Sequence, residues 1–135
     1  MATLKLEIVT PEAKVFSDEV EMVTLPGVEG ELGIYPMHAP LMTQIVPGEI
    51  IVRKGDQDIF LAVGEGFAEI TGDHVSVLSD MAIEAANIDE AKVEEARRRA
   101  EARLAEKLSA EDAALVQATL VRAAAQLKVK QRRRQ

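Results

Sequence analysis

The placement of glycine and proline constrains the fold of this 135-residue chain more than any other feature. All eight glycines lie at or before Gly72, and all five prolines lie at or before Pro47. Because glycine and proline mark turns and interrupt helices, the chain divides into a turn-rich first part and an uninterrupted second part.

Charge follows the same division. Residues 1–87 carry four Lys/Arg against fifteen Asp/Glu, a net charge of −11, whereas residues 88–135 carry twelve against eight, a net charge of +4. We therefore expect two domains, 1–87 and 88–135. The acidic total argues against nucleic acid as a partner of the whole chain, but it leaves an anionic partner open for the second part.

Several classes of protein are disfavoured by the composition of the chain. There is no cysteine, which excludes a disulfide framework and a thiol nucleophile. The longest apolar run, Ile59 to Val63, is about five residues, whereas a transmembrane helix needs about 20. The first residues lack the basic-then-apolar order of a signal peptide. We expect a soluble protein that stays where it is made.

Residues 1–87 have the pattern of short strands. Apolar and polar side chains alternate, as at Leu4, Leu6 and Ile8, which is the period of a half-buried strand. Two hairpins are expected, one turning at residues 55–57 and one at Gly72-Asp73. Several strands separated by turn signals suggest a sandwich or a barrel. Residues 27–40, with three glycines and two prolines, are expected to form a loop of defined shape.

The second part has the pattern of two helices. Asn87 is the expected N-cap of the first helix, with Glu90 three residues later, and Ser109 is the expected N-cap of the second. Each helix is expected to be about twenty residues long. The link around Ser109 is too short for anything but an antiparallel helical hairpin. Alanine is abundant on both helices, so they should form easily and pack loosely.

Residues 113–135 contain six Lys/Arg and no acidic residue. They could form a solvated end that suits the C-terminus of a helix, or a surface for an acidic partner, whether protein or nucleic acid. No pattern indicates catalysis or metal binding. His38 and His74 have no second ligand at metal-binding spacing, and Ser76 and Ser79 lack the surroundings of a nucleophile. We expect a protein that is not an enzyme and that holds no metal.

Four stretches resemble a known family. The segment Glu29-Gly30-Glu31-Leu32-Gly33-Ile34-Tyr35-Pro36-x-His38-Ala39-Pro40-Leu41 is similar to the signature of the epsilon subunit of bacterial F-type ATP synthase. The opening Val9 to Phe16, the motif Gly64-Glu65-Gly66-Phe67-Ala68-Glu69 and the end Arg122-Ala123-x-x-Gln126-Leu127 resemble it too. The resemblance covers the whole chain. It implies a β-sandwich of about ten short strands followed by an antiparallel α-helical hairpin.

The resemblance also implies a function. The sandwich would be a central-stalk domain that grips the gamma subunit and rests on the c-subunit ring, with Glu31 and His38 at the ring. The hairpin would be mobile and would inhibit ATP hydrolysis by extending into the alpha/beta hexamer. Its basic residues Arg99, Arg103, Arg122 and Lys128 would meet an acidic segment there. The protein would be a non-catalytic subunit of a proton-translocating complex, peripheral to the cytoplasmic face of a bacterial cell membrane.

Some members of this family bind ATP on the folded hairpin through an Ile/Leu-Asp-x-x-Arg-Ala motif and distal arginines. The candidate residues for weak ATP binding are Ile88, Asp89, Lys92, Arg99 and Arg122. Lys92 and Val93 depart from the motif, and Gln126 stands where some members have another arginine. Lysine lacks the planar fork of arginine, so we expect ATP to bind weakly or not at all, and no other cofactor. The alternative function is an acidic sandwich whose basic hairpin docks on nucleic acid or another acidic partner.

Overall fold

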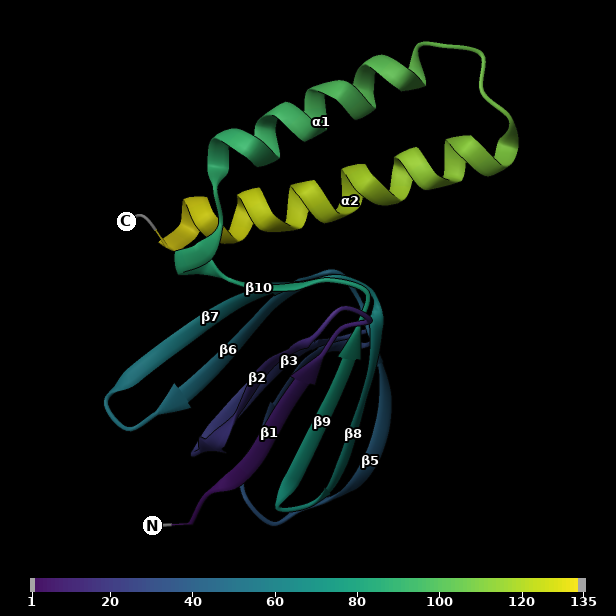
Figure 1. Ribbon diagram of the computed structural model, residues 1–135. Coiled ribbons are helices and arrows are strands. Elements are labelled where there is room, and N and C mark those ends of the chain that lie inside the picture. Colours follow the sequence, from purple (N-terminus) through teal and green to yellow (C-terminus); the bar gives the residue numbers. More distant parts are fainter. Residues whose placement is uncertain (1, 134–135) are drawn as a thin grey trace.

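The computed structural model describes residues 2–133 and contains ten strands, a 3-10 turn and two helices in that part of the chain (Figure 1). The strands are β1 (Leu4–Val9), β2 (Lys14–Val20), β3 (Met22–Gly27), β4 (Gly30–Ile34), β5 (His38–Ile45), β6 (Gly48–Lys54), β7 (Gln57–Val63), β8 (Gly66–Gly72), β9 (His74–Ser79) and β10 (Ala82–Glu84). The 3-10 turn η1 (Ala85–Asn87), α1 (Glu90–Leu104) and α2 (Ala110–Arg133) come after the strands.

Hydrogen bonding joins the strands into one path that folds over on itself. One layer has the order β10-β7-β6-β3, with β4 on the far side of β3, and the other has the order β5-β8-β9-β1-β2. A single residue pair between β3 and β5, Gly27 with Ile45, links the layers along one edge. All pairs are antiparallel except β1 with β9. The expected β-sandwich with about ten strands is therefore confirmed.

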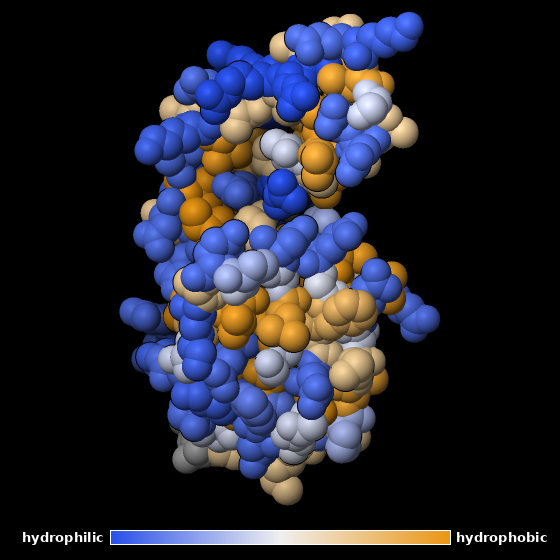
Figure 2. Space-filling model, turned by 45° about the vertical axis from the view of Figure 1, so that its right-hand side comes forward, coloured by the Kyte–Doolittle hydropathy of each residue, from blue (hydrophilic) through white to orange (hydrophobic). Residues whose placement is uncertain are grey.

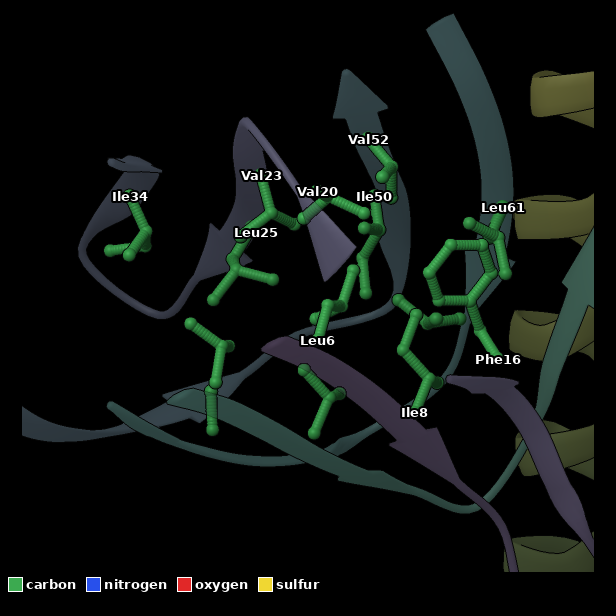
Figure 3. Packing of buried hydrophobic residues seen from close by; sticks show 14 of the residues in the cluster. Leu6, Ile8, Phe16, Val20, Val23, Leu25, Ile34, Ile50, Val52 and Leu61 are labelled. Carbon is green, nitrogen blue, oxygen red and sulfur yellow. The ribbon is translucent and has the colours of Figure 1, made fainter. Parts of the chain in front are cut away.

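The main core lies between the two layers. Apolar side chains from both layers point toward one another there (Figure 3), and they belong to the alternating set that the sequence indicates, Leu4, Leu6 and Ile8 included. Each of these three side chains is at most 1% exposed. The apolar core is thus a direct consequence of period-2 patterning on strands that each present one face to the other layer.

Glycine sets the two expected hairpin turns. Gly55 has φ of 62° and Gly72 has φ of 57°, a left-handed conformation that glycine adopts without steric cost. The Gly72-Asp73 turn is confirmed, because Thr71 pairs with His74. The other turn is shorter than expected, since Lys54 pairs with Gln57 and leaves only residues 55 and 56 between the strands.

The expectation of a loop over residues 27–40 is wrong. Gly30–Ile34 forms β4, which pairs with β3, and β5 begins at His38. Only two short turns remain, at residues 28–29 and 35–37. The glycines in this segment had suggested irregular backbone, but pairing with β3 satisfies the backbone groups of β4 and outweighs the low strand propensity of glycine.

The helical hairpin is confirmed, with two differences in detail. The N-cap of α1 is Asp89 and not Asn87; its carboxylate accepts a hydrogen bond from the Lys92 backbone N–H at 3.2 Å. The first helix has 15 residues, shorter than the expected twenty. Ser109 caps α2 as expected, accepting from the Asp112 N–H at 3.1 Å. No helix within residues 2–133 is long and apolar enough to cross a membrane.

Candidate functional site

The helical hairpin rests on the sandwich through α2, which lies between α1 and the strands β6 and β7 (Figure 1). A second apolar cluster marks this contact and is separate from the main core. Its buried members are Ala62 of β7, Ala85 of η1, Ile88 between η1 and α1, and Val129 of α2. Phe60, Ile83 and Val93 pack against them. Two of its four buried members are alanine, so the cluster buries little apolar area compared with the main core.

Three cationic side chains on the C-terminal half of α2 complete the contact. Arg132 Nη1 lies 3.4 Å from a carboxylate oxygen of Glu49, whose side chain is only 8% exposed. Arg122 Nη1 lies 3.7 Å from Asp80 Oδ2, and Lys130 donates a hydrogen bond to the Ala85 carbonyl at 3.0 Å. The basic end of α2 therefore meets acceptors on the acidic first part of the chain.

Packing beneath α2 is incomplete. A hollow of about 400 Å³ separates the helix from the ends of β3, β4 and β6. Its lining includes two prolines and several small side chains of α2, and also carries charged groups from both sides: Glu31 and Glu49 from the strands, Lys128 and Arg132 from α2. Small side chains on α2 leave this space unfilled, in agreement with the loose packing that the alanine content predicts.

The residues considered for ATP binding do not form a single site. Lys92 and Arg122 share a hollow of about 220 Å³ between the two helices, and Arg99 and Arg103 share a second one of about 230 Å³. Both hollows include Ala96 and Thr119, so they are neighbours in one interhelical groove. Ile88 is only 4% exposed within the second apolar cluster, and Asp89 is engaged as the N-cap of α1.

The two candidates for the ring contact lie at opposite ends of the sandwich. Glu31 pairs with Pro26 next to the hollow beneath α2, whereas His38 pairs with Gly72 at the other end of β5. The strand from His38 to Ile45 spans roughly 23 Å at the usual rise per residue. The His38 ring approaches the Ala39 carbonyl, with Nδ1 at 2.7 Å from the oxygen. The structure does not bring these two side chains together.

An exposed apolar face on the other layer was not anticipated from the sequence. Met42 of β5, Phe67 of β8 and Leu78 of β9 are 67%, 56% and 56% exposed. Phe67 is directly opposite Leu78, so these two side chains stand side by side on the outside of the sheet. Figure 2 shows orange patches on this side of the sandwich, below the helices. The sequence did carry a signal for this face, because Phe67 occupies an outward position in the alternation of β8. Large exposed apolar groups mark interaction surfaces.

A second exposed apolar feature lies at the end of the sandwich away from α2. Tyr35 and Met37 are 60% and 82% exposed on the turn between β4 and β5, where they line a hollow of about 540 Å³ together with Met22. Met37 has φ of 65°, and its N–H donates to the Asp73 carboxylate at 2.8 Å. Holding a bulky residue in this left-handed conformation costs free energy, and such strain is often found at functional positions.

Ion pairs stabilise the outer surface of the strands. The Lys14 ammonium at 2.8 Å, and then the His74 ring at 2.9 Å, hold the pKa of the Glu7 carboxyl below its usual range. The contact with Lys54 likewise lowers the pKa of Asp18. Among residues 2–133 no group of three or more His, Asp or Glu side chains is arranged to hold a metal ion.

The fold defines a two-part protein, a β-sandwich on which a basic helical hairpin is docked. Comparison with protein families identifies it further. A model of the beta-sandwich domain of the ATP synthase delta/epsilon chain matches residues 3–85, and a model of the long alpha-helix domain of that chain matches residues 86–131. The chain belongs to the ATP synthase delta/epsilon chain family.

Individual relatives agree with this assignment. An ATP synthase epsilon chain of Dehalococcoides mccartyi is 51% identical over 89 residues, which are 66% of this chain and 64% of the relative. Those of Polynucleobacter necessarius and Laribacter hongkongensis are 45% and 41% identical over 67% of this chain, and the match covers 66% of each. The chain thus spans slightly less than two thirds of the length of these relatives.

Solved structures share the fold. A chain of the Euglena gracilis mitochondrial ATP synthase aligns with a TM-score of 0.66 at 20% identity, over 97% of this chain and 79% of that one. A chain of the Tetrahymena thermophila mitochondrial ATP synthase central stalk and c-ring aligns with a TM-score of 0.57 at 14% identity, over 96% and 97%. The resemblance seen in the sequence is therefore confirmed for both family and fold, and the nucleic-acid alternative is not favoured.

Proposed function

We propose that the chain is a non-catalytic central-stalk subunit of a proton-translocating F-type ATP synthase. In this role it couples rotation of the c-subunit ring to the catalytic head and inhibits ATP hydrolysis through its helical hairpin. The observation that carries the proposal is the weak attachment of α2. A small alanine-rich cluster, a hollow of about 400 Å³ and the partly exposed Asp80–Arg122 ion pair are the features that a hairpin able to leave the sandwich requires.

Each exposed surface suits one partner. Residues 1–87 form the rotor-binding domain, and the apolar face of Met42, Phe67 and Leu78 suits the gamma subunit, since large apolar groups need cover. Glu31 and His38 are the candidate contacts with the c-subunit ring, and they lie at opposite ends of the sandwich. Residues 88–135 form the regulatory domain. The protein would be peripheral to the cytoplasmic face of a bacterial cell membrane, held there by the complex.

The basic arm would engage an acidic segment of the alpha/beta hexamer through Arg99, Arg103, Arg122 and Lys128. Arg99 and Lys128 are exposed even while the hairpin is docked. Arg103 is exposed too, near the end of α1, whereas Arg122 faces Asp80. Three of these four cations are therefore accessible to an anionic surface without any change in the sandwich. Charge complementarity would mainly speed the association of the hairpin with the hexamer and fix the register of that contact.

ATP would be at most a weak regulatory ligand in the interhelical groove. Lys92 and Arg122 can supply positive charge there, but Arg99 lines the neighbouring hollow, Ile88 is buried in the second apolar cluster and Asp89 caps α1. Calorimetric titration should show affinity weaker than micromolar, and micromolar binding would contradict this. The Lys92→Arg variant should bind more tightly than the unaltered chain, because guanidinium contacts phosphate oxygens in a bidentate manner.

The main test is reconstitution with the other subunits of the complex. A chain truncated after Asn87 should assemble and support ATP synthesis while it releases the inhibition of ATP hydrolysis. The control is the full chain with Glu101→Gln, which removes an ion pair with Arg97 on α1 and involves none of the four basic-arm residues. Equal hydrolysis rates with the truncated and full chains would remove the inhibitory role, and failure to copurify with gamma would remove the central-stalk role.

A further inference from the structure

In the motif Gly64-Glu65-Gly66, the backbone conformation of Gly64 does not by itself require glycine. Gly64 is outside the left-handed region, yet a Cβ placed on it would lie 1.8 Å from Asp80 Oδ1 and 2.9 Å from Asp80 Cγ. The missing side chain thus lets the Asp80 carboxylate rest directly on the loop between β7 and β8. Since Oδ1 is the end of a movable side chain, a methyl group here would displace the carboxylate rather than the backbone.

The backbone on both sides of this carboxylate is tightly held. Ser79, only 6% exposed, donates from its hydroxyl to the Met81 carbonyl at 2.9 Å and accepts from the Gly64 N–H at 3.1 Å. The Asp80 N–H donates to the Glu65 carbonyl at 3.0 Å. These bonds fix the position of the Asp80 backbone, so the direction of its carboxylate depends on the space that Gly64 leaves.

The carboxylate is directed at the hairpin. Asp80 Oδ2 lies 3.7 Å from Arg122 Nη1, and the two side chains are 46% and 36% exposed. Arg122 is also one of the basic residues proposed to meet an acidic segment of the catalytic head. When the hairpin leaves the sandwich, Arg122 moves away from Asp80, and its guanidinium is then free for a carboxylate of the partner.

We propose that Gly64, Asp80 and Arg122 form a clasp that keeps α2 on the sandwich, and that an acidic partner opens it by competing for Arg122. The inference rests on the proposed function, since it assumes that the hairpin moves. Asp80 acts as an internal substitute for the partner's acidic group, and Gly64 is the positioning residue that directs it. The Glu49–Arg132 pair and the Lys130 hydrogen bond reinforce the contact further along α2.

The chain has no cysteine, so two introduced ones can carry a pair of dyes specifically. Gln57→Cys on the sandwich and Gln117→Cys on α2 replace exposed residues, one on each part. Energy transfer between the dyes in the full chain at low salt reports the ratio of undocked to docked hairpin. Gly64→Ala, Asp80→Asn and Arg122→Gln should each raise that ratio about two- to fivefold, as expected for a partly exposed ion pair.

Two controls separate the clasp from general damage. Gly33→Ala is a matched glycine substitution on β4, and Glu95→Gln removes an ion pair confined to α1; neither should change the ratio. Exchanging the charges, with Asp80→Arg and Arg122→Asp together, should restore docking relative to either single change. Poly-L-glutamate should raise the ratio of undocked to docked hairpin in the unaltered chain, and should raise it less in the Arg122→Gln variant.

The outcomes distinguish the clasp from the moving hairpin. If Asp80→Asn and Arg122→Gln give the same ratio as Glu95→Gln while poly-L-glutamate still opens the chain, the clasp is refuted and the hairpin still moves. If neither poly-L-glutamate nor high salt nor any variant changes energy transfer, the moving hairpin of the proposed function fails together with the clasp. If Gly64→Ala prevents folding, Asp80→Asn still tests whether the clasp holds the hairpin on the sandwich.

Discussion

Replacing Val129 by alanine should release the hairpin and leave the sandwich folded. Val129 is 2% exposed in the second apolar cluster. The change removes two methyl groups from that cluster, a loss of about 1.6 kcal/mol at about 0.8 kcal/mol per buried carbon. This corresponds to a drop of roughly 15-fold in the ratio of docked to undocked hairpin. Alanine has the higher helix propensity, so α2 itself is not weakened.

The assay combines energy transfer, with dyes at positions 57 and 117, and thermal unfolding of the same sample. The matched control is Val52→Ala, the same chemical change at a residue that is 0% exposed in the main core. Val52→Ala should lower the unfolding temperature of the sandwich and leave the docked fraction unchanged. The reasoning is refuted if Val129→Ala lowers that temperature as much as Val52→Ala and leaves energy transfer unchanged, because the two clusters would then be one cooperative unit.

Three further outcomes are expected. Lys14 keeps the pKa of Glu7 below its ordinary value of 4.5, so this carboxylate stabilises the fold above pH 4.5 and loses its effect as the pH falls through the lowered pKa. In urea unfolding, the Glu7→Gln variant should therefore lose less stability in acid than the unaltered chain does. Gly66→Ala should lower the unfolding temperature more than Gly64→Ala, because its Cβ would lie 1.8 Å from a backbone carbonyl oxygen that cannot move aside; an equal effect of the two would contradict this. Ser109→Ala removes the N-cap bond to Asp112 at a cost of about 1 kcal/mol, which circular dichroism should register as less helix at high temperature, and Ser109→Asp should restore it.

The sequence alone predicts most of the local structure. Alternation at Leu4, Leu6 and Ile8 determines which face of β1 is buried. The Gly72-Asp73 turn occurs where the glycine backbone allows a positive φ, and the Ser109 N-cap occurs where a hydroxyl can accept a backbone hydrogen bond. These features depend on neighbours within a few residues, which is why they can be read from sequence. The same rules failed at Asn87, because two cap-forming residues occur close together and Asn87 belongs to the 3-10 turn, which leaves Asp89 to cap α1.

The candidate site was only partly accessible to sequence reasoning. Lys92 and Arg122 were both expected in a regulatory site, and the structure brings them into one groove. Glu31 was expected at the ring, and nothing in its local sequence indicated that it would also line a hollow beneath α2. Such contacts join residues far apart in the chain, and no local periodicity encodes them.

The division of the chain into two parts is determined by composition. Glycine, proline and alternating side chains favour strands in residues 1–87, and alanine-rich sequence without breaks favours the two helices of the second part. Only the tertiary structure decides how the parts meet. The charge of −11 on one part and +4 on the other predicts attraction in general, but attraction between charges is not directional. The position of Asp80 against Arg122 depends on a close approach at Gly64 that only the folded chain creates.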